Sequence, residues 1–259
     1  MPDLAALDWS TIFWTILPFI AVGFAAQMID GALGMAFGVI TNTALVVFLG
    51  MPPRLASATV HAVESFTTAA SGISHVLQRN VDWKLFGRLV IPGMIGGVLG
   101  AYVLSTLDAD VAKPFVMAYL AAIGLYLLYR AWRGTVEPRE PRIVEPLGLI
   151  GGFLDAAGGG GWGPVVTSNL LVQGAQPRKT IGTVNTSEFF LTTTISATFL
   201  VTIGFSAFTL QAIGILIGGV AAAPFGAVLA KRVPARPLMG LIGGLLTATS
   251  AYSVWAALA

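Results

Sequence analysis

The sequence predicts an all-α polytopic membrane protein, and its composition, the length of its apolar segments and an internal duplication all favour that class. Of the 259 residues, 56% are hydrophobic and only 10% are charged, and the mean hydropathy is +0.83. Soluble domains carry roughly 25% charged residues, so this chain lacks the polar surface that water requires. Its apolar runs are continuous over about 20 residues, as in membrane-spanning helices, whereas transmembrane β-strands alternate over about 10 residues.

The composition also excludes several kinds of chemistry. Cysteine is absent, so no disulfide, thiol nucleophile or thiolate metal site exists. Only His61 and His75 are available as imidazole ligands, and we expect no metal and no cofactor. The basic residues stand in short loops between apolar segments, where they act as topology signals, so we expect a lipid bilayer and no nucleic acid as a partner. Residues 1–10 hold two aspartates and no basic residue, unlike a signal peptide.

Two halves joined by a polar connection are predicted. Residues 1–132 form the first transmembrane repeat, 133–146 a Pro-rich and charged cytoplasmic linker, and 147–259 the second transmembrane repeat. The apolar segments that we expect are 11–29, 31–49, 55–78, 84–106 and 113–132 in the first half, and 147–157, 162–173, 178–203, 208–230 and 235–257 in the second.

A set of polar and glycine positions recurs in both halves. Pro53-Arg54 and Pro177-Arg178 are separated by 124 residues, and the same offset relates Thr59 to Thr183 and Glu64 to Glu188. Several polar positions in one register indicate a duplication rather than chance similarity between Gly-rich helices.

The distribution of basic residues predicts that the repeats are inverted. If each opening, 11–50 and 147–175, folds as a Gly-broken hairpin that returns to its own side, three full spans follow in each half. Every Lys and Arg except Arg54 and Lys113 then lies on one face, which agrees with the positive-inside rule. An odd number of spans per half inverts the second repeat. Segment 11–29 is long enough to cross alone, so two full spans over 11–49 remain the alternative.

The glycine clusters predict where the helices break. Gly31 and Gly34 in the first half, and the run Gly158–Gly161 in the second, should interrupt a helix, because irregular backbone at membrane depth is tolerated only where it is buried or lines a cavity. We expect half-helices to begin after Gly31 and after Gly158, with free N–H groups directed into a midplane cavity. Asp30 and Asp155 precede the breaks, and capping is their favoured role over cation binding or proton carriage.

Glu64 and Glu188 are predicted to lie near the bilayer centre, because each stands about ten residues into its helix. An ionisable group at that depth is a candidate functional residue, and both are predicted proton carriers. His61 and Asn185 precede them by three residues and share their helix face. His61 with Glu64 is half of a metal site, but no His-rich partner is present in the sequence.

Arg54 and Arg178 open their helices after a proline, either as interfacial arginines or as part of an anion site with the helix N-terminus. Neutral hydrogen bonds from Asn42 and Asn169 add to such a site. The predicted substrate-binding residues are Gly31, Gly34, Asn42, Arg54, Thr59, His61, Gly158, Gly159, Gly160, Gly161, Asn169, Arg178, Thr183 and Asn185.

The duplicated pattern resembles the sulfite exporter TauE/SafE family of bacterial membrane permeases. The resemblance rests on Gly31-x-x-Gly34, on Gly158-Gly-Gly-Gly-Trp-Gly-Pro164, and on the Pro-Arg and Thr-x-x-x-x-Glu pieces of both halves, and it covers essentially the whole chain. It implies a multi-pass protein of the bacterial inner membrane that moves sulfite, organosulfonates or related sulfur oxyanions. The first half departs from the second in its Gly-Ala-Leu-Gly break and in His61 at the position of Asn185, so the half-sites are not equivalent.

We therefore expect a secondary transporter of a small anion that works by alternating access, with proton coupling through Glu64, Glu188 or His61. A passive anion channel and a carboxylate-based cation transporter are the alternatives. An intramembrane enzyme is disfavoured, because the sequence contains no HExxH or GxSxG motif. The Gly faces of 84–106 and 208–230 fit packing within one chain or within a homodimer.

Overall fold

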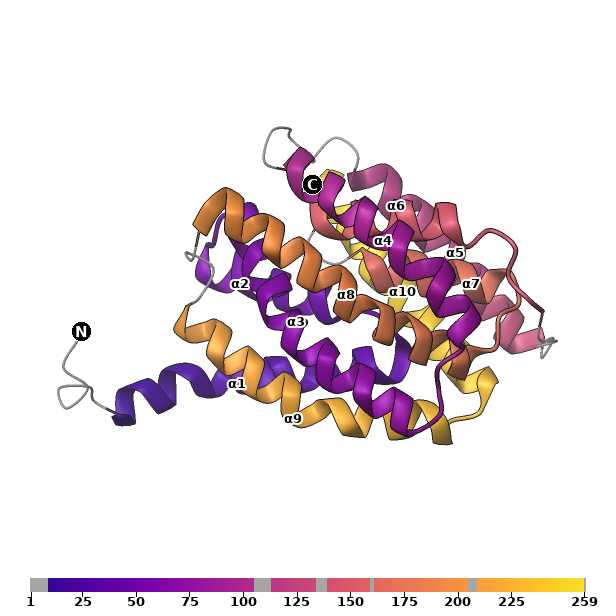
Figure 1. Cartoon of the computed structure of the whole chain (residues 1–259), viewed down its shortest axis with the longest axis horizontal. Helices are drawn as coiled ribbons and strands as arrows, with labels where there is room; N and C mark the ends of the chain where they lie inside the picture. The colour runs from indigo at the N-terminus through magenta and orange to yellow at the C-terminus, as the bar shows by residue number, and fades with distance from the viewer. Residues whose placement is uncertain (1–8, 105–112, 134–138, 159–160, 205–208, 259) are drawn as a thin grey trace.

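The computed structural model describes residues 9–104, 113–133, 139–158, 161–204 and 209–258, which form helices joined by short connections (Figure 1). Three of these helices are long and apolar enough to cross a membrane, over Ile12–Leu33, Trp83–Val103 and Leu210–Arg232. Over the described residues the structure therefore confirms an all-helical fold with membrane-spanning candidates.

In the part of the chain that the structure describes, each half contains five successive helical elements. The first half holds α1 (Trp9–Leu33), α2 (Phe37–Leu49), α3 (Pro53–Leu77), α4 (Trp83–Leu104) and α5 (Lys113–Arg133). The second half holds α6 (Glu145–Gly158), a π-helix (Gly163–Thr167) that continues into α7 (Ser168–Val172), and then α8 (Pro177–Ile203), α9 (Leu210–Arg232) and α10 (Ala235–Leu258).

The same local signals start α3 and α8. Pro53 and Pro177 are the first residues of these helices, where the missing N–H of proline has no cost. Gly50 and Gly174 precede them with positive φ angles of 61° and 99°, which glycine adopts without strain. Both pairs of residues keep the 124-residue offset, so the duplication extends to backbone conformation.

The break in the first half lies later than the sequence predicts. We expected a half-helix to begin after Gly31, but α1 continues to Leu33 and α2 begins at Phe37. A Cβ atom on Gly31 would lie 3.1 Å from the Cα of Gly226 in α9, so Gly31 permits close helix packing instead. Gly34, with φ of 71°, is the glycine at the break.

The two opening segments also differ in length. Helix α1 has 25 residues, about 37 Å of rise, which exceeds the ~30 Å hydrocarbon core. Helix α6 has 14 residues, about 21 Å, and is too short to cross alone. By length α1 is able to span, whereas α6 is not.

The halves are interleaved rather than set side by side as separate bodies. The most extensive contacts join α1 to α9, α4 to α6, α5 to α10 and α3 to α8, and α3 and α4 of the first half run past α8 of the second (Figure 1). The equivalent helices are α1 and α6, α3 and α8, α4 and α9, and α5 and α10. When each helix is replaced by its equivalent, the same set of contacts results.

Glycines make the closest of these contacts possible. Cβ atoms on Gly96 and Gly152 would overlap the carbonyl groups of Leu149 and Gly93, so α4 and α6 approach backbone to backbone. Gly218 of α9 meets the backbone of Ile20 in α1 in the same way. The glycine-rich faces of α4 and α9 therefore pack within one chain, as one of our two expectations had it.

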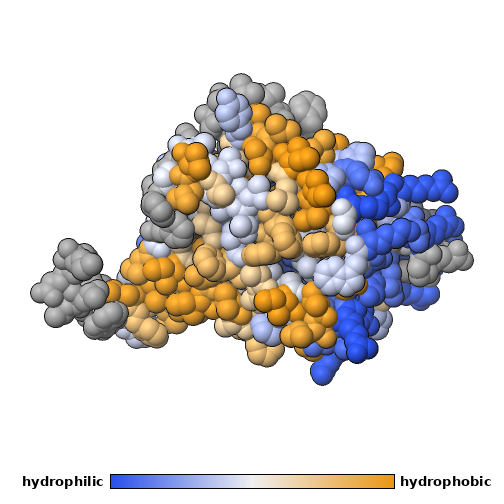
Figure 2. Space-filling model, viewed as in Figure 1, coloured by the Kyte–Doolittle hydropathy of each residue, from blue (hydrophilic) through white to orange (hydrophobic). Residues whose placement is uncertain are grey.

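Hydrophilic side chains gather at one end of the molecule (Figure 2). We call the end where Arg178 and Lys231 meet the residues after α3 the basic end. Arg178, at the start of α8, donates to Asn80 Oδ1 (2.7 Å) and to the carbonyl of Gln78, directly after α3. Lys231, at the end of α9, donates to Gln78 Oε1 (3.1 Å). Helices α3 and α9 therefore end where α8 begins.

Candidate functional site: a buried ionisable cluster between the halves

Six ionisable side chains of the described residues are almost inaccessible, with exposed fractions of 5% or less. They are Asp30 of α1, His61, Glu64 and His75 of α3, Asp155 of α6 and Glu188 of α8. No Lys or Arg is buried among the residues described. Because ionised carboxylates are costly in a medium of low dielectric constant, this set needs protons or a bound cation to balance it.

Glu64 and Glu188 lie on α3 and α8, one of the helix pairs through which the halves meet. Each has its Oε2 atom buried with no hydrogen-bond partner among the described residues. Glu64 and Glu188 also interact electrostatically with each other and with Asp30 and Asp155. The four carboxyl groups therefore form one interacting cluster at the contact between the halves.

Asp155 caps the broken helix of the second half. Its Oδ1 atom accepts a hydrogen bond of 2.9 Å from the backbone N–H of Trp162, which neutralises the free end of the segment after the break. In the first half, the Asp30 carboxylate accepts from the backbone N–H of Phe37, the first residue of α2. The aspartate and the donor N–H are seven residues apart in both halves, so this geometry agrees with the capping role that the sequence favoured.

The two helix breaks touch each other. Thr167 Oγ1 donates to the carbonyl of Gly34 (2.7 Å), and a Cβ on Gly163 would lie 2.6 Å from the Cα of Met35. Gly161 packs equally closely, because its Cβ would be 2.9 Å from the Asp155 nitrogen. The irregular backbone of each half is thus buried against the other, as membrane depth demands.

His61 connects α3 to α6 across the halves. Its Nδ1 atom lies 2.8 Å from the carbonyl oxygen of Ser57, and its Nε2 atom lies 3.1 Å from Asp155 Oδ2. The sequence analysis favoured Asp155 as a cap over cation binding or proton carriage, and it did not pair Asp155 with His61. The available signal was an aspartate in an apolar segment, because an ionisable group at that depth usually pairs with another buried group.

Asn185, the counterpart of His61, makes a different contact. Its Oδ1 atom accepts from Ser71 Oγ (2.8 Å), and its Nδ2 atom donates to the backbone carbonyls of Ile181 (3.2 Å) and Asp30 (3.4 Å). Both positions therefore reach the aspartate segment of the opposite half, but only His61 reaches an aspartate side chain.

Several predicted substrate-binding residues lie elsewhere. Arg178 and Thr183 are near the basic end, where Thr183 Oγ1 accepts from the backbone N–H of Asp82 (2.8 Å). Asn169 Nδ2 donates to Val165 O (2.7 Å), and Thr59 Oγ1 contacts Met51 Sδ (3.9 Å). These contacts position backbone and helices, so none of the four belongs to the carboxyl cluster.

The structure gives the places of some of the remaining predicted residues. Asn42 has a buried Oδ1 atom without a partner among the described residues, and Gly158 is the last residue of α6. Gly159, Gly160 and the side chain of Arg54 lie outside the described residues.

Gln27 is a buried polar residue that sequence reasoning overlooked. It is fully buried in α1, and both of its side-chain amide atoms lack a partner among the described residues. It stands three residues before Asp30 and so shares its helix face. A polar residue in an apolar run was the available signal.

His61, Glu64 and Asp155 also have the spacing of a metal site, since one ligand atom from each lies within 4.8 Å of the others. The sequence offered only His61 and Glu64 for such a site and so predicted none. One proton between His61 Nε2 and Asp155 Oδ2 would satisfy their 3.1 Å contact, so this geometry does not require a metal.

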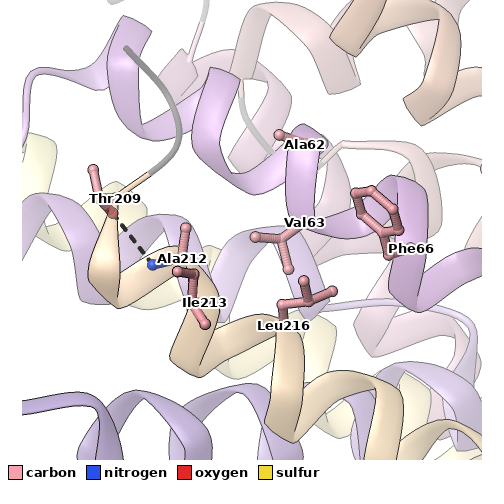
Figure 3. A pocket seen from close by; sticks show the side chains of 7 residues that line it. All are labelled: Ala62, Val63, Phe66, Thr209, Ala212, Ile213 and Leu216. Atoms are coloured by element: carbon pink, nitrogen blue, oxygen red, sulfur yellow. Dashed lines mark hydrogen bonds between the residues drawn. The ribbon is translucent and has the colours of Figure 1, made fainter. Parts of the chain in front are cut away.

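An apolar pocket between α3 and α9 is separate from this cluster (Figure 3). Val63, Phe66 and Leu216 are among the residues that line it, and Thr209 accepts from the backbone N–H of Ala212 (3.2 Å) at the start of α9. With no charged side chain in its wall, the pocket suits hydrocarbon rather than an anion.

The fold and the buried cluster define a helical membrane protein with ionisable groups between two interleaved halves, the arrangement of a membrane transporter. The sequence profile of the family described as sulfite exporter TauE/SafE matches residues 19–253, and the chain belongs to this family. It is therefore a membrane transporter.

Two relatives bear names that agree. A probable membrane transporter protein of Bacillus subtilis, YtnM, is 42% identical over 248 residues, 92% of this chain and 82% of the relative. A probable membrane transporter protein of Haemophilus influenzae is 30% identical over 151 residues, 56% of this chain and 58% of the relative. No solved structure matches the chain.

Proposed function

We propose that this protein is a secondary transporter that moves a small anion, of the class of sulfite, organosulfonates or related sulfur oxyanions, across the bacterial inner membrane. Transport proceeds by alternating access, with Glu64 and Glu188 as proton carriers. The family supports the substrate class, because its description names sulfite export. The observation that carries the proposal is the carboxyl cluster where α3 and α8 meet.

Two inverted repeats form the moving parts of the proposed transporter. The shared set of helix contacts supports a twofold relation between the halves. The opposite directions of α3 and α8, which meet at the basic end through Arg178 and Gln78, support inversion. Helices α4 and α9 are a second equivalent pair. Helix α9 ends at the basic end, near Gln78, whereas the first turns of α4 contact the start of α6 through Arg88 and Glu145.

The basic end faces the cytoplasm in this proposal. Loops rich in Lys and Arg stay on the cytoplasmic side of a bilayer, and hydrophilic residues gather at this end (Figure 2). Both chain termini then face outward in this proposal.

Protons and the anion are coupled through electrostatics. While the four carboxyl groups are ionised, they repel an anion from the space between the helix breaks, because charges interact strongly in a low dielectric. Protonation removes this repulsion and releases the N–H groups of Phe37 and Trp162 from their aspartate caps. Backbone N–H groups at helix starts are donors suited to an anion, so the anion enters together with protons.

A carboxylate-based cation transporter is the second candidate, and one observation favours it. Four buried carboxyl groups with no buried Lys or Arg among the described residues resemble a hard-cation site more than an anion site. A passive anion channel is less well supported, because a pore should show polar side chains along its length, whereas these cluster between the halves.

The test is flux in proteoliposomes that contain the purified wild type, Glu188→Gln or Glu64→Gln. We expect saturable uptake of radiolabelled sulfite that a proton gradient accelerates, and loss of that acceleration in either variant. Empty liposomes and liposomes with an equal gradient of chloride are the controls. No sulfite or sulfonate flux in any gradient, together with cation uptake that both variants abolish, would replace this proposal with the cation transporter.

A further inference from the structure

The two histidines of the chain differ in what faces their ring nitrogens. His75 has an acceptor on one side and a donor on the other, because Nε2 lies 3.0 Å from the carbonyl of Gly31 and Nδ1 lies 3.1 Å from the amide nitrogen of Asn80. A neutral imidazole satisfies both contacts, with its proton on Nε2. His75 is therefore a structural histidine.

His61 has acceptors on both sides. Its Nδ1 atom must carry a proton to bond the carbonyl of Ser57 at 2.8 Å. Its Nε2 atom is then 3.1 Å from Asp155 Oδ2, and a neutral imidazole would present a lone pair there to an ionised carboxylate. The contact is favourable only if one further proton lies between Nε2 and Oδ2, on either partner.

We propose that His61 and Asp155 hold this shared proton as a latch between α3 of the first half and α6 of the second, and that the latch is a proton-coupling site. The coupling role rests on the proposed transport function, whereas the shared proton does not. The ionisable groups that face the pair are Glu64 from α3, Asp30 from α1 and Glu188 from α8.

Loss of the proton changes the contact from attractive to repulsive. When the proton leaves to water on the open side, the Nε2 lone pair and the Asp155 carboxylate face each other without a donor, and the helices separate. Asp155 also holds the Trp162 N–H at 2.9 Å, so separation moves the start of the broken helix with it. One proton thus links the α3–α6 contact to the helix break.

The other half has no titrating counterpart of this latch. Asn185 replaces His61, and it reaches the carbonyl oxygen of Asp30 rather than its side chain. A carboxamide does not titrate, so this contact is insensitive to pH. The chain therefore contains its own control: Asn is tolerated at this position of the repeat, and the exchange His61→Asn copies it.

The shared proton is tested by nitrogen NMR of protein labelled with ¹⁵N-histidine in detergent. The chain has only two histidines, so His61→Asn assigns both sets of signals. We expect Nε2 of His61 to show a bound or hydrogen-bonded proton near neutral pH, and Asp155→Asn to abolish it while His75 is unchanged. An Nε2 signal of a bare acceptor that ignores Asp155→Asn overturns the proposal, and so does a signal that shifts on chelation and returns with Zn²⁺ or Mn²⁺.

The coupling role is tested in proteoliposomes with wild type, His61→Asn and, as a control outside the cluster, Gly87→Ala, where an added Cβ meets nothing within 4 Å, each confirmed as monodisperse. We expect His61→Asn to lose the stimulation of sulfite flux by a proton gradient and Gly87→Ala to retain it. Wild-type stimulation in His61→Asn overturns the coupling role while the proposed function stands. Absence of flux in the wild type refutes the proposed function and the coupling role together, and the NMR result still decides whether the proton is shared.

Discussion

Thr68 and Thr192 occupy equivalent positions in the two halves, and their Oγ1 atoms lie 3.3 Å apart. Each hydroxyl donates to the carbonyl of the glutamate one turn earlier, Glu64 or Glu188. Residues at equivalent positions of the two halves therefore meet where α3 packs against α8. The glutamates therefore flank the point at which the halves meet.

This contact predicts a crosslink. The chain has no cysteine, so the double variant Thr68→Cys/Thr192→Cys carries one thiol on each half. We expect a disulfide on mild oxidation, because the hydroxyl positions are close enough for side chains to meet. After cleavage at a protease site introduced in the linker 133–146, the halves should migrate together on a non-reducing gel. Single-cysteine variants are the controls, and separated halves in the double variant would contradict the contact.

The unpaired amide of Gln27 predicts a gain in stability from an apolar replacement. Gln27→Leu removes two buried polar atoms that have no partner among the described residues, each costing about 1–3 kcal/mol when unsatisfied. We expect a higher melting temperature in detergent, because the two unsatisfied atoms are gone, and a lower flux if the Gln27 amide binds the substrate or its ion. A lower melting temperature would mean that the amide is bonded to a group that the structure does not hold.

The close contact of α4 with α6 predicts opposite effects for two glycines of α4. Gly96→Ala places a methyl group against the carbonyl of Leu149, whereas a Cβ on Gly87 meets nothing within 4 Å. We expect Gly96→Ala to destabilise the protein by about 1–3 kcal/mol. Gly87→Ala should be neutral or stabilising by up to about 1 kcal/mol, because alanine favours helix. Thermal unfolding in one detergent compares them, and equal melting temperatures would refute the backbone contact.

Acid should weaken the junction of α4 and α6 at the basic end. The guanidinium of Arg88 donates to Glu145 at 2.6 Å and lowers the pKa of Glu145 from 4.5 to about 2. A depressed carboxyl pKa contributes stability above its unfolded value and loses it as pH falls from about 4.5 toward 2. The effect is small, because the pair is half exposed and screened. Melting temperatures of the wild type should approach those of Glu145→Gln over this range, and a constant difference would exclude the linkage.

Much of the fold was predictable from the sequence, because a lipid environment allows few kinds of backbone structure. Apolar length gives the helices, and Pro53, Pro177 and their neighbouring glycines mark where two of them begin. The predicted helix break after Gly31 was wrong, because a glycine in a membrane helix allows either a break or a close contact with another helix. Only the position of Gly226 opposite Gly31 decides between them.

The candidate site was predictable in its members but not in its connections. Glu64, Glu188 and His61 followed from burial of ionisable groups, yet the partner of His61 is Asp155, 94 residues away. That pairing forms because α6 of the second half packs against helices of the first half. A single sequence does not show which helices of the two halves are in contact. The role of Arg178 stayed open for the same reason, because an arginine after a proline at a helix start fits an anion site and an interfacial anchor equally well.

The contacts of Arg178 predict a structural phenotype. Arg178→Ala removes the hydrogen bonds to Asn80 Oδ1 (2.7 Å) and the Gln78 carbonyl (3.0 Å), and Asn80 in turn holds His75. We expect a loss of about 1–3 kcal/mol, because a buried amide oxygen is left without its charged donor. Arg178→Lys should recover part of this, since lysine reaches one acceptor but lacks the planar fork. If flux fell while the melting temperature stayed unchanged, Arg178 would belong to an anion site and not to the anchor between α3 and α8.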